Sequence, residues 1–268
     1  MRGVILAGGT GSRLHPLTRI TNKHLLPIGD RPMISYGVEA LVKAGVTEIM
    51  VVTGGTHAGE FLRLLSNGQE FGVERLLYAY QERAGGIAEA LGLAAQFVGD
   101  DAAVVMLADN IFGRSFASCV RRFAEKPEGA RLLLAEVKDP AHLRHLGVPE
   151  LDGSGRIVRI VEKPDDPPST YCVTGVYLYD SGVFDVIRTL RPSGRGELEI
   201  TDVNNHYVAE GLIGYDVQEG FWGDAGESID AYYAVNDHVR RYGANLDCGP
   251  RGASATVNAS ERWAWTWT

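Results

Sequence analysis

Residues 4–14 read VILAGGTGSRL, and this stretch sets the fold class that the rest of the chain follows. Its four apolar residues are typical of a buried strand, and Gly8, Gly9 and Gly11 then predict a turn. Glycine has no Cβ, so the N–H groups of such a turn can come close to phosphate oxygens. Arg13 and, ten residues later, Lys23 add two cations. We therefore expect a strand that ends in an anion-binding loop.

Two standard phosphate-loop motifs do not fit this stretch. A dinucleotide-binding fingerprint needs a third glycine where Leu14 stands, and a P-loop needs a Gly-Lys-Ser/Thr ending that is absent. A plain strand-to-loop turn is the remaining alternative. The two cations favour phosphate binding over it.

Apolar runs alternate with helical periodicity through the first half of the chain, which is typical of a layered α/β sheet. We predict an α/β fold with a mixed, largely parallel central sheet flanked by helices, in one domain of residues 1–243. Its core covers about 1–128, its more mixed part about 129–243, and residues 244–268 form a tail of unknown role. The expected strands are Val4–Ala7, Ile49–Thr53, Leu76–Tyr80, Val104–Leu107, Leu132–Val137, Ile157–Val161 and Val173–Tyr179. The expected helices are 32–45, Ala58–Ser66, Ile87–Phe97 and Ser228–Arg241.

Composition limits the classes of partner. The 268 residues carry a formal net charge of -8, which argues against nucleic acid and anionic membranes, because both need a broad basic surface. The three cysteines are far apart without C-x-x-C spacing, so neither disulfides nor a zinc site is expected. The first apolar run is too short for a signal peptide or a membrane span, and we expect a cytoplasmic protein.

Two aspartates are candidate magnesium ligands. Asp109 follows the strand Val104–Leu107 and should emerge at the carboxyl end of the sheet, where open α/β folds bind ligands. Magnesium is usually held by one or two carboxylates plus substrate phosphates, and Asp224 in FWGDAG (221–226) is the best second candidate. A turn or cap role is the alternative for either aspartate taken singly.

A second polar group follows the strand Ile157–Val161. Pro164 ends that strand, so Glu162 and Lys163 should project from a sheet end. Lys163 would suit the phosphate of a sugar phosphate and Glu162 a sugar hydroxyl.

Taken together, these segments resemble the bacterial glucose-1-phosphate thymidylyltransferases, especially their short form, in the sugar nucleotidylyltransferase family. The resemblance spans about residues 2–241. It is carried by Gly8–Leu14 with Pro16, Thr18, Lys23, Leu26-Pro27 and Pro32-Met33-Ile34, by Gln81 with Gly85-Gly86-Ile87-Ala88, by Asp109-Asn110-Ile111-Phe112, by Glu162-Lys163-Pro164, by Val173-Thr174-Gly175-Val176-Tyr177 and by Arg195–Asp202.

The resemblance implies a Rossmann-like nucleotidyltransferase fold and a reaction between a nucleoside triphosphate (dTTP or UTP) and a sugar-1-phosphate, most simply glucose-1-phosphate. A sugar phosphate oxygen attacks the α-phosphorus in line and pyrophosphate leaves, so no protein nucleophile is needed. Magnesium is the implied cofactor, on Asp109 and Asp224. A homo-oligomer, commonly a tetramer, is the implied assembly.

Residue roles follow from the same resemblance. The implied catalytic residues are Arg13, Lys23, Asp109, Lys163 and Asp224. The implied nucleotide-binding residues are Leu6, Gly8, Gly9, Gly11, Ser12, Arg13, Gln81, Gly86 and Asp109. The implied sugar-phosphate-binding residues, in the part after residue 128, are Gly147, Glu162, Lys163, Val173, Gly175, Tyr177, Arg195 and Trp222, joined by Asn110.

The chain departs from the family pattern close to where the nucleoside should lie (Ala108), beside the expected sugar pocket (139–148) and near the second aspartate (Gly223 and Glu227-Ser228). Ala108 replaces a glycine, the segment 139–148 is a few residues longer, and Leu146 replaces an aromatic residue. Gly223 replaces a larger residue, and Glu227-Ser228 replace a Thr-His pair. We expect the sugar selectivity to be altered, with the alternative that the longer segment is a loop facing solvent and glucose stays preferred.

Two other function classes stay in view. A regulatory protein that keeps the fold and binds nucleotide-sugars without turnover is disfavoured by the intact Arg13, Lys23, Asp109, Lys163 and Asp224. A dehydrogenase would need the glycine fingerprint that Leu14 interrupts.

Overall fold

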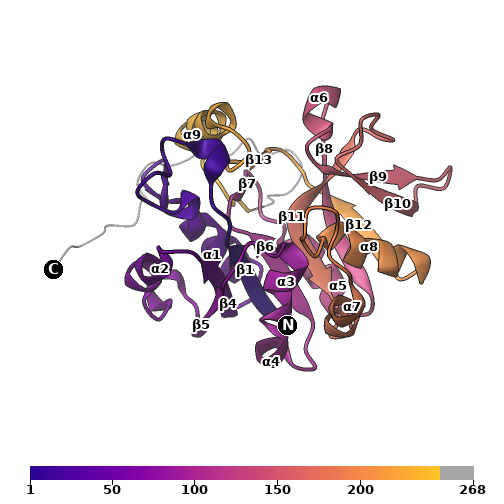
Figure 1. Cartoon of the computed structure of the whole chain (residues 1–268), viewed down its shortest axis with the longest axis horizontal. Coiled ribbons are helices and arrows are strands. Elements are labelled where there is room, and N and C mark those ends of the chain that lie inside the picture. Colours follow the sequence, from indigo (N-terminus) through magenta and orange to yellow (C-terminus); the bar gives the residue numbers. More distant parts are fainter. Residues whose placement is uncertain (248–268) are drawn as a thin grey trace.

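The computed structural model describes residues 1–247, and a seven-stranded sheet runs through its centre (Figure 1). The strand order is β12-β8-β11-β6-β1-β4-β5. The predicted strands are confirmed, each to within two residues at either end. The sheet consists of β1 (Arg2–Ala7), β4 (Glu48–Gly54), β5 (Arg75–Gln81), β6 (Ala103–Leu107), β8 (Ala130–Glu136), β11 (Tyr171–Tyr179) and β12 (Ile213–Val217).

Strand directions make the sheet mixed but mainly parallel, as predicted. β1 pairs in parallel with β4 and β6, β4 pairs in parallel with β5, and β12 pairs in parallel with β8. Only β11 runs against its neighbours among these seven strands, antiparallel to both β6 and β8. Short two-stranded pairs complete the β-structure: β2 (Pro27–Ile28) with β3 (Arg31–Pro32), β7 (Asn110–Phe112) with β13 (Trp222–Asp224), and β9 (Gly147–Leu151) with β10 (Ile157–Glu162).

Helices cover both faces of the sheet because the central strand β1 is apolar on both. Val4 and Leu6 of β1 face one apolar core, and Ile5 and Ala7 face the other. The first core is closed by α3 (Ile87–Gly92), α4 (Ala95–Val98), α7 (Val183–Thr189) and α8 (Ile200–Ala209). The second is closed by α1 (Met33–Lys43), α2 (Ala58–Leu65) and α5 (Ala117–Glu125).

The single helix predicted over Ile87–Phe97 is wrong, because the chain forms two helices there. Gly92 ends α3, and a turn at Leu93-Ala94 precedes α4. In this turn the N–H of Ala94 bonds the carbonyl of Leu91 at 2.9 Å, three residues back instead of four. Glycine is a poor helix former, and this one lies against Ile187 of α7, where an added Cβ would be 3.4 Å from the isoleucine.

The predicted C-terminal helix is present as α9 (Ile229–Tyr242), and it ties the two ends of the described chain together. Ser228 caps it by accepting a hydrogen bond from the N–H of Ala231 at 3.0 Å. Its apolar side packs on the segment that follows the glycine-rich loop, including Leu26, Ile28 and Met33. Asp224 ends β13 a few residues before this helix, and Gly226 between them lies against Lys23 and Asp109.

The beginning of the predicted tail belongs to the body. Asn245 is buried, its side chain donates to the carbonyl of Tyr36 at 2.9 Å, and its N–H donates to that of Phe112 at 2.8 Å. Residues 248–268, including Cys248, lie outside the described part. Cys119 and Cys172 are buried free thiols. Within residues 1–247, no helix is both long enough and apolar enough to cross a membrane.

The β9–β10 hairpin and the short helix α6 (Pro140–Leu143) lie at one end of the molecule, away from α2 and β5 (Figure 1). Asn205 of α8 holds this hairpin, because its side chain bonds both the N–H and the carbonyl of Ile160 at 2.8 and 2.9 Å. Glu162 and Lys163 at the end of β10 are thus turned toward the sheet.

Gly86, at the start of α3, offers a test of this architecture. Its φ is +98°, and an added Cβ would lie 2.4 Å from the backbone oxygen of Leu198. Gly86→Ala should lower the free energy of unfolding by at least about 1–3 kcal/mol. Gly59→Ala is the matched control, since the Cβ at 59 has no neighbour within 4 Å and alanine favours helix α2. Equal urea midpoints for the two variants would contradict the close approach at Gly86.

Candidate active site

A cavity of about 360 Å³ opens at the carboxyl ends of β1 and β6. Of the residues predicted from the sequence, the structure brings all but Gly11 and Ser12 to its walls. Those that line it are Leu6, Gly8, Gly9, Arg13, Lys23, Gln81, Gly86, Asp109, Asn110, Gly147, Glu162, Lys163, Val173, Gly175, Tyr177, Arg195, Trp222 and Asp224.

Gly11 and Ser12 do not line the cavity, and Gly11 shapes the loop. Gly11 has a φ of +63°, and its carbonyl accepts a hydrogen bond from Thr18 Oγ1 at 2.7 Å. An added Cβ would lie 3.1 Å from Thr18 and 3.3 Å from Lys23. Gly11 therefore lets the chain fold back so that Arg13 and Lys23 reach the same cavity.

Gln81 closes the end of the cavity next to β5. Its side chain is 8% exposed, and Nε2 lies 3.3 Å from the carbonyl of Gly86 and 3.2 Å from Glu89 Oε1. An added Cβ at Gly8 would lie 3.1 Å from Gln81 Oε1. The amide is therefore held against the glycine-rich loop, with a carbonyl and an amide group to offer a planar ligand.

Asp109 and Lys23 form the central ion pair of the cavity. The Lys23 ammonium contacts Asp109 Oδ2, and Asn110 Nδ2 donates to Asp109 Oδ1 at 3.1 Å. The buried ring of His24 lies on the same carboxylate, with Nε2 3.9 Å from Oδ2. Asp224 joins from the opposite side, where β13 pairs with β7 and Asp224 faces Asn110 in register.

The charges of this group shift one another's pKa. Burial would raise the pKa of Asp109, but the Lys23 ammonium, the His24 ring and the hydrogen bond from Asn110 together outweigh it, so the pKa falls well below its usual range. Burial and the negative charge of Asp109 raise the pKa of Asp224. Burial lowers the pKa of Lys23, but Asp109 and Asp224 reverse the effect and the net shift is upward. Asp109 contacts the Lys23 ammonium and Asp224 lies close enough to raise its pKa, so these two carboxylates are the residues of the cavity that could hold a divalent ion.

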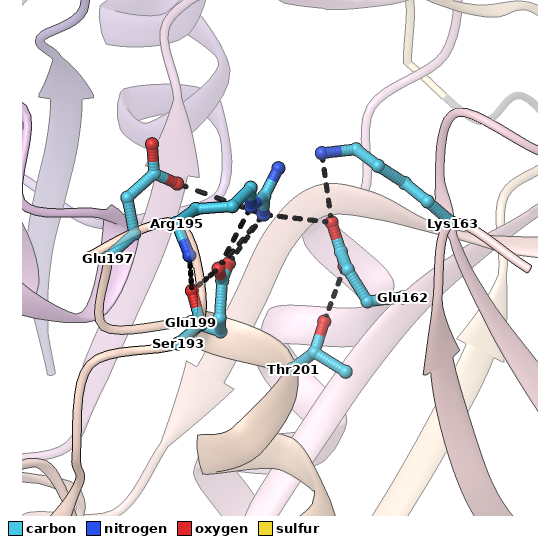
Figure 2. Close-up of polar contacts among 7 residues, drawn as sticks. All are labelled: Glu162, Lys163, Ser193, Arg195, Glu197, Glu199 and Thr201. Atoms are coloured by element: carbon cyan, nitrogen blue, oxygen red, sulfur yellow. Dashed lines mark hydrogen bonds and ion pairs between the residues drawn. The ribbon is translucent and has the colours of Figure 1, made fainter.

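The opposite end of the cavity is built around Glu162 (Figure 2). Its Oε2 accepts a hydrogen bond from Thr201 at 2.7 Å, and its Oε1 lies 3.3 Å from Lys163 Nζ and 3.7 Å from Arg195 Nη2. Arg195 Nη2 also lies 2.9 Å from each carboxylate oxygen of Glu199. Arg195 is therefore held mainly by Glu199. Lys163 contacts only the carboxylate of Glu162 among these acidic groups, so its ammonium is more available to a ligand.

Lys163 sits in a strained backbone conformation. Its φ is +46°, in the left-handed region that non-glycine residues rarely adopt, and its N–H bonds the carbonyl of Leu146 at 3.0 Å. Such strain is found where a fold fixes a functional side chain. Pro164 follows and ends β10, as the sequence predicted.

Asn110 links the two ends of the cavity. Its Oδ1 accepts from the N–H of Gly175 at 3.0 Å and from Trp222 Nε1 at 2.6 Å. Gly175 must be glycine here, because an added Cβ would lie 2.7 Å from the Asn110 amide. The same position interrupts the pairing register of β11 with β8. One buried amide therefore connects β7, β11 and β13.

Comparison with known proteins matches this architecture. A model of the nucleotidyl transferase family matches residues 2–241 of the chain. The chain belongs to the nucleotidyl transferase family. A glucose-1-phosphate thymidylyltransferase from Actinoplanes sp. is 44% identical over 243 residues, which cover 90% of this chain and 78% of that protein. The protein of the same name from Neisseria meningitidis is 41% identical, over 88% of this chain and 82% of its own.

A solved structure shares the fold at still higher identity. It is described as that of a candidate glucose-1-phosphate thymidylyltransferase from Bacillus anthracis in complex with sucrose. It superposes with a TM-score of 0.84 at 49% identity, over 90% of this chain and 95% of that one. This nucleotidyl transferase is therefore an enzyme with the Rossmann-like fold that the sequence predicted.

The structure shows which of the residues that depart from the family pattern line the cavity. Leu146 lines the cavity, together with His145. Gly223 does not, which corrects the expectation that it removes a side chain from the sugar pocket. Its Cβ would lie 2.7 Å from Val235 and 3.0 Å from the Phe221 ring, so position 223 faces α9. Ala108 is fully buried in the second apolar core.

The longer segment 139–148 packs on the enzyme. Leu143 of α6 is 2% exposed in a small apolar cluster to which Leu146 and Trp222 add their side chains. His142 stacks on the Trp222 ring, with centroids 6.2 Å apart and planes 11° apart, and its Nε2 lies 2.7 Å from Glu227 Oε2. The alternative of a loop that faces only solvent is thereby excluded for His142.

Several cavity residues were not assigned roles from the sequence. The largest group is Glu197, Glu199 and Thr201, which lie in the quoted motif 195–202 and could have been found there by weighing each polar side chain of that motif. His24 follows Lys23 directly and has no motif of its own. His145 lies in the longer segment, where no pattern indicates which histidine faces the cavity.

The contact between His142 and Glu227 predicts a measurable titration. The carboxylate at 2.7 Å raises the pKa of His142 against the opposing effect of burial. NMR of the imidazole should therefore give a pKa above the ordinary 6.5, and Glu227→Gln should lower it. Glu60→Gln, which removes the partner of His57 on α2, is the matched control and should leave His142 unchanged. If the pKa of His142 is the same in the Glu227→Gln variant as in the parent protein, the contact is disproved.

Proposed function

We propose that the enzyme joins dTTP or UTP to glucose-1-phosphate and releases pyrophosphate, giving dTDP-glucose or UDP-glucose. The observation that carries this proposal is one cavity with two chemically distinct ends. Arg13, Lys23 and the glycine-rich loop form the first end, and Glu162 with Lys163 forms the second. The names of the relatives from Actinoplanes and Neisseria support the same substrates.

The chemistry asks mainly for positioning. Two anions that repel one another must meet, with an oxygen of the sugar phosphate aimed at the α-phosphorus and pyrophosphate leaving on the opposite side. Arg13 and Lys23 neutralise the triphosphate, and Lys163 holds the sugar phosphate from the other end. Glu162 then accepts a hydrogen bond from a sugar hydroxyl. The attacking oxygen belongs to the substrate, so the phosphorus transfer needs no nucleophile from the chain.

Gln81 is the proposed contact of the base. Its amide can pair with the carbonyl and N–H edge of a pyrimidine, which purines do not present in the same place. It cannot sense the C5 methyl of thymine by hydrogen bonding. A methyl in an apolar pocket is worth about 1–3 kcal/mol, so we expect UTP to be used along with dTTP.

Magnesium is the proposed cofactor, held by Asp109 and Asp224. The residues fit, since the Lys23 ammonium already serves as a cation for these two carboxylates. Residues 1–247 contain no cluster of three or more His, Cys, Asp or Glu for a metal, which suits an ion bound by two carboxylates and the phosphates of the substrate. When bound, the ion would supply positive charge at the phosphates. Lys23 is then free to turn from Asp109 to the triphosphate.

Removing either carboxylate tests the metal assignment. Asp109→Asn and Asp224→Asn should each lower kcat by about a hundredfold or more, because a catalytic metal supplies several kcal/mol. Binding of Mn²⁺ measured by electron paramagnetic resonance should weaken in parallel. Asp237→Asn on the exposed side of α9 is the control and should keep both properties. A near-normal rate of Asp109→Asn at limiting magnesium would remove the assignment.

The two ends of the cavity predict a division of labour. Lys163→Ala should raise KM mainly for glucose-1-phosphate, whereas Arg13→Ala should impair the use of nucleotide and lower kcat. Steady-state kinetics with each substrate varied in turn measures this. Lys126→Ala, which removes an exposed partner of Glu128, is the control. Identical kinetic profiles for Lys163→Ala and Arg13→Ala would contradict separate sites.

A pyrophosphate-release assay over pairs of nucleotide and sugar phosphate tests the whole proposal. The pairs should combine dTTP, UTP and GTP with the 1-phosphates of glucose, galactose, glucosamine and mannose. Tight binding without turnover of any pair would favour the regulatory alternative. We also propose a homo-oligomer, to be measured by light scattering, and a cytoplasmic location, where nucleoside triphosphates are available.

A further inference from the structure

Trp222 forms part of the wall of two cavities. It lines the active-site cavity and also a neighbouring cavity of about 520 Å³, bounded by β8, α6 and the segment that leads into β13. Its side chain also packs against two apolar clusters, so it is only partly exposed to these cavities. Where a ring borders a cavity, close packing is incomplete, and specific contacts contribute to holding its orientation.

The orientation of Trp222 matters because of the hydrogen bond that it makes. Nε1 donates to Asn110 Oδ1 at 2.6 Å, and Asn110 is 2% exposed. The same oxygen accepts from Gly175, and the amide nitrogen donates to Asp109. If Trp222 moved, the Asn110 network would lose a donor in a buried place, and buried networks respond as a unit.

Two groups outside the active-site cavity restrain the indole. His142 lines only the second cavity of the two and stacks on Trp222, with planes 11° apart. Glu227 lies in the loop after β13 and holds Nε2 of His142 at 2.7 Å. His142 in turn is anchored by α6, whose Leu143 is buried and whose first turn is capped by Asp139.

We propose that His142, held by Glu227, is a positioning residue of the sugar-phosphate pocket that acts through Trp222 on Asn110. The path runs from α6 through the indole to Asn110 Oδ1, and from there to the N–H of Gly175, whereas Asp109 stays paired with Lys23. This proposal rests on the proposed function, which supplies the sugar phosphate as substrate. Loss of the pair lets Trp222 turn toward the second cavity, so the end of the site that receives the sugar phosphate loosens and the nucleotide end keeps its geometry.

The charge of Glu227 also helps to hold His142 in place. The Glu227 carboxylate favours the imidazolium form of His142 and raises its pKa. The pair is only partly exposed, with side chains 31% and 18% accessible, so solvent screens it less than an open surface pair.

Kinetics of His142→Ala tests the proposal. We expect KM for glucose-1-phosphate to rise about fivefold to tenfold, which corresponds to the loss of roughly 1–1.4 kcal/mol of binding. The KM for dTTP should change by less than about twofold, since the nucleotide end is not touched. His57→Ala is the matched control, because it removes a histidine at 3.1 Å from a glutamate far from the cavity. Equal changes in both KM values, or the same change in His57→Ala, would overturn the proposal.

A double-mutant cycle tests whether Glu227 acts through His142. Glu227→Gln should shift KM in the same direction, and adding it to His142→Ala should change KM little further, because the two residues share one path. Fully additive effects would show that they act separately and would refute the coupling. Both variants should unfold at temperatures close to that of the parent, because the change is confined to a partly exposed pair.

A readout without turnover separates this proposal from the proposed function. In a background of Trp263→Phe, Trp265→Phe and Trp267→Phe, Trp222 is the single tryptophan of the 268 residues. In that background His142→Ala should make Trp222 fluorescence more accessible to acrylamide, and His57→Ala should not. If His142→Ala makes Trp222 more accessible but the parent enzyme turns over no substrate pair, the proposed function is refuted and the role of His142 stands. If the parent enzyme turns over its substrates normally and His142→Ala changes neither the accessibility of Trp222 nor KM, the role of His142 is refuted and the proposed function stands.

Discussion

The contact between the Lys23 ammonium and the Asp109 carboxylate is the interaction on which the site depends. A carboxylate at the carboxyl end of a buried strand is costly unless a cation and hydrogen bonds compensate it. Lys23 and Asn110 supply both. Gly226 closes over the pair so tightly that an added Cβ would lie 2.4 Å from Asp109 Oδ2. The loop that carries Asp224 is therefore shaped around this pair, and α9 holds that loop in place.

The two ends of the cavity differ in the charged groups that line them. At the end next to the glycine-rich loop, the cations Arg13 and Lys23 line the cavity beside the backbone of Gly8 and Gly9. At the other end, Arg195 is already bound to Glu199, with Glu162 and Glu197 within 4 Å. Lys163 contacts the single carboxylate of Glu162, and its left-handed backbone fixes where its side chain leaves the chain.

The reversed strand β11 is what lets the two ends share one cavity. It crosses the sheet between β6 and β8, and its Gly175 gives the Asn110 amide room to reach it. Asn110 accepts a hydrogen bond from the N–H of Gly175 and donates one to Asp109, so one buried amide adjoins both ends of the cavity. Trp222 adds a further bond to this amide, and His142 stacks on Trp222.

The sequence by itself determined the sheet and the glycine-rich loop, and it placed Asp109 and Lys163 after strands. These features are local, because an apolar strand followed by glycines needs no information from elsewhere. Other cavity residues, such as Gln81 and Gly175, were named through the resemblance to a family. Where a prediction from the sequence was wrong, a contact between distant segments determined the local structure. The helix over 87–97 breaks at a glycine that lies against α7, and position 223 faces α9 instead of the cavity. The neighbours of His142 and of Arg195 come from other elements of the chain, such as the loop after β13 and the end of β10. Only the tertiary structure could assign them, because the energy of such a contact depends on where two separate segments meet in space, and residue order does not record it.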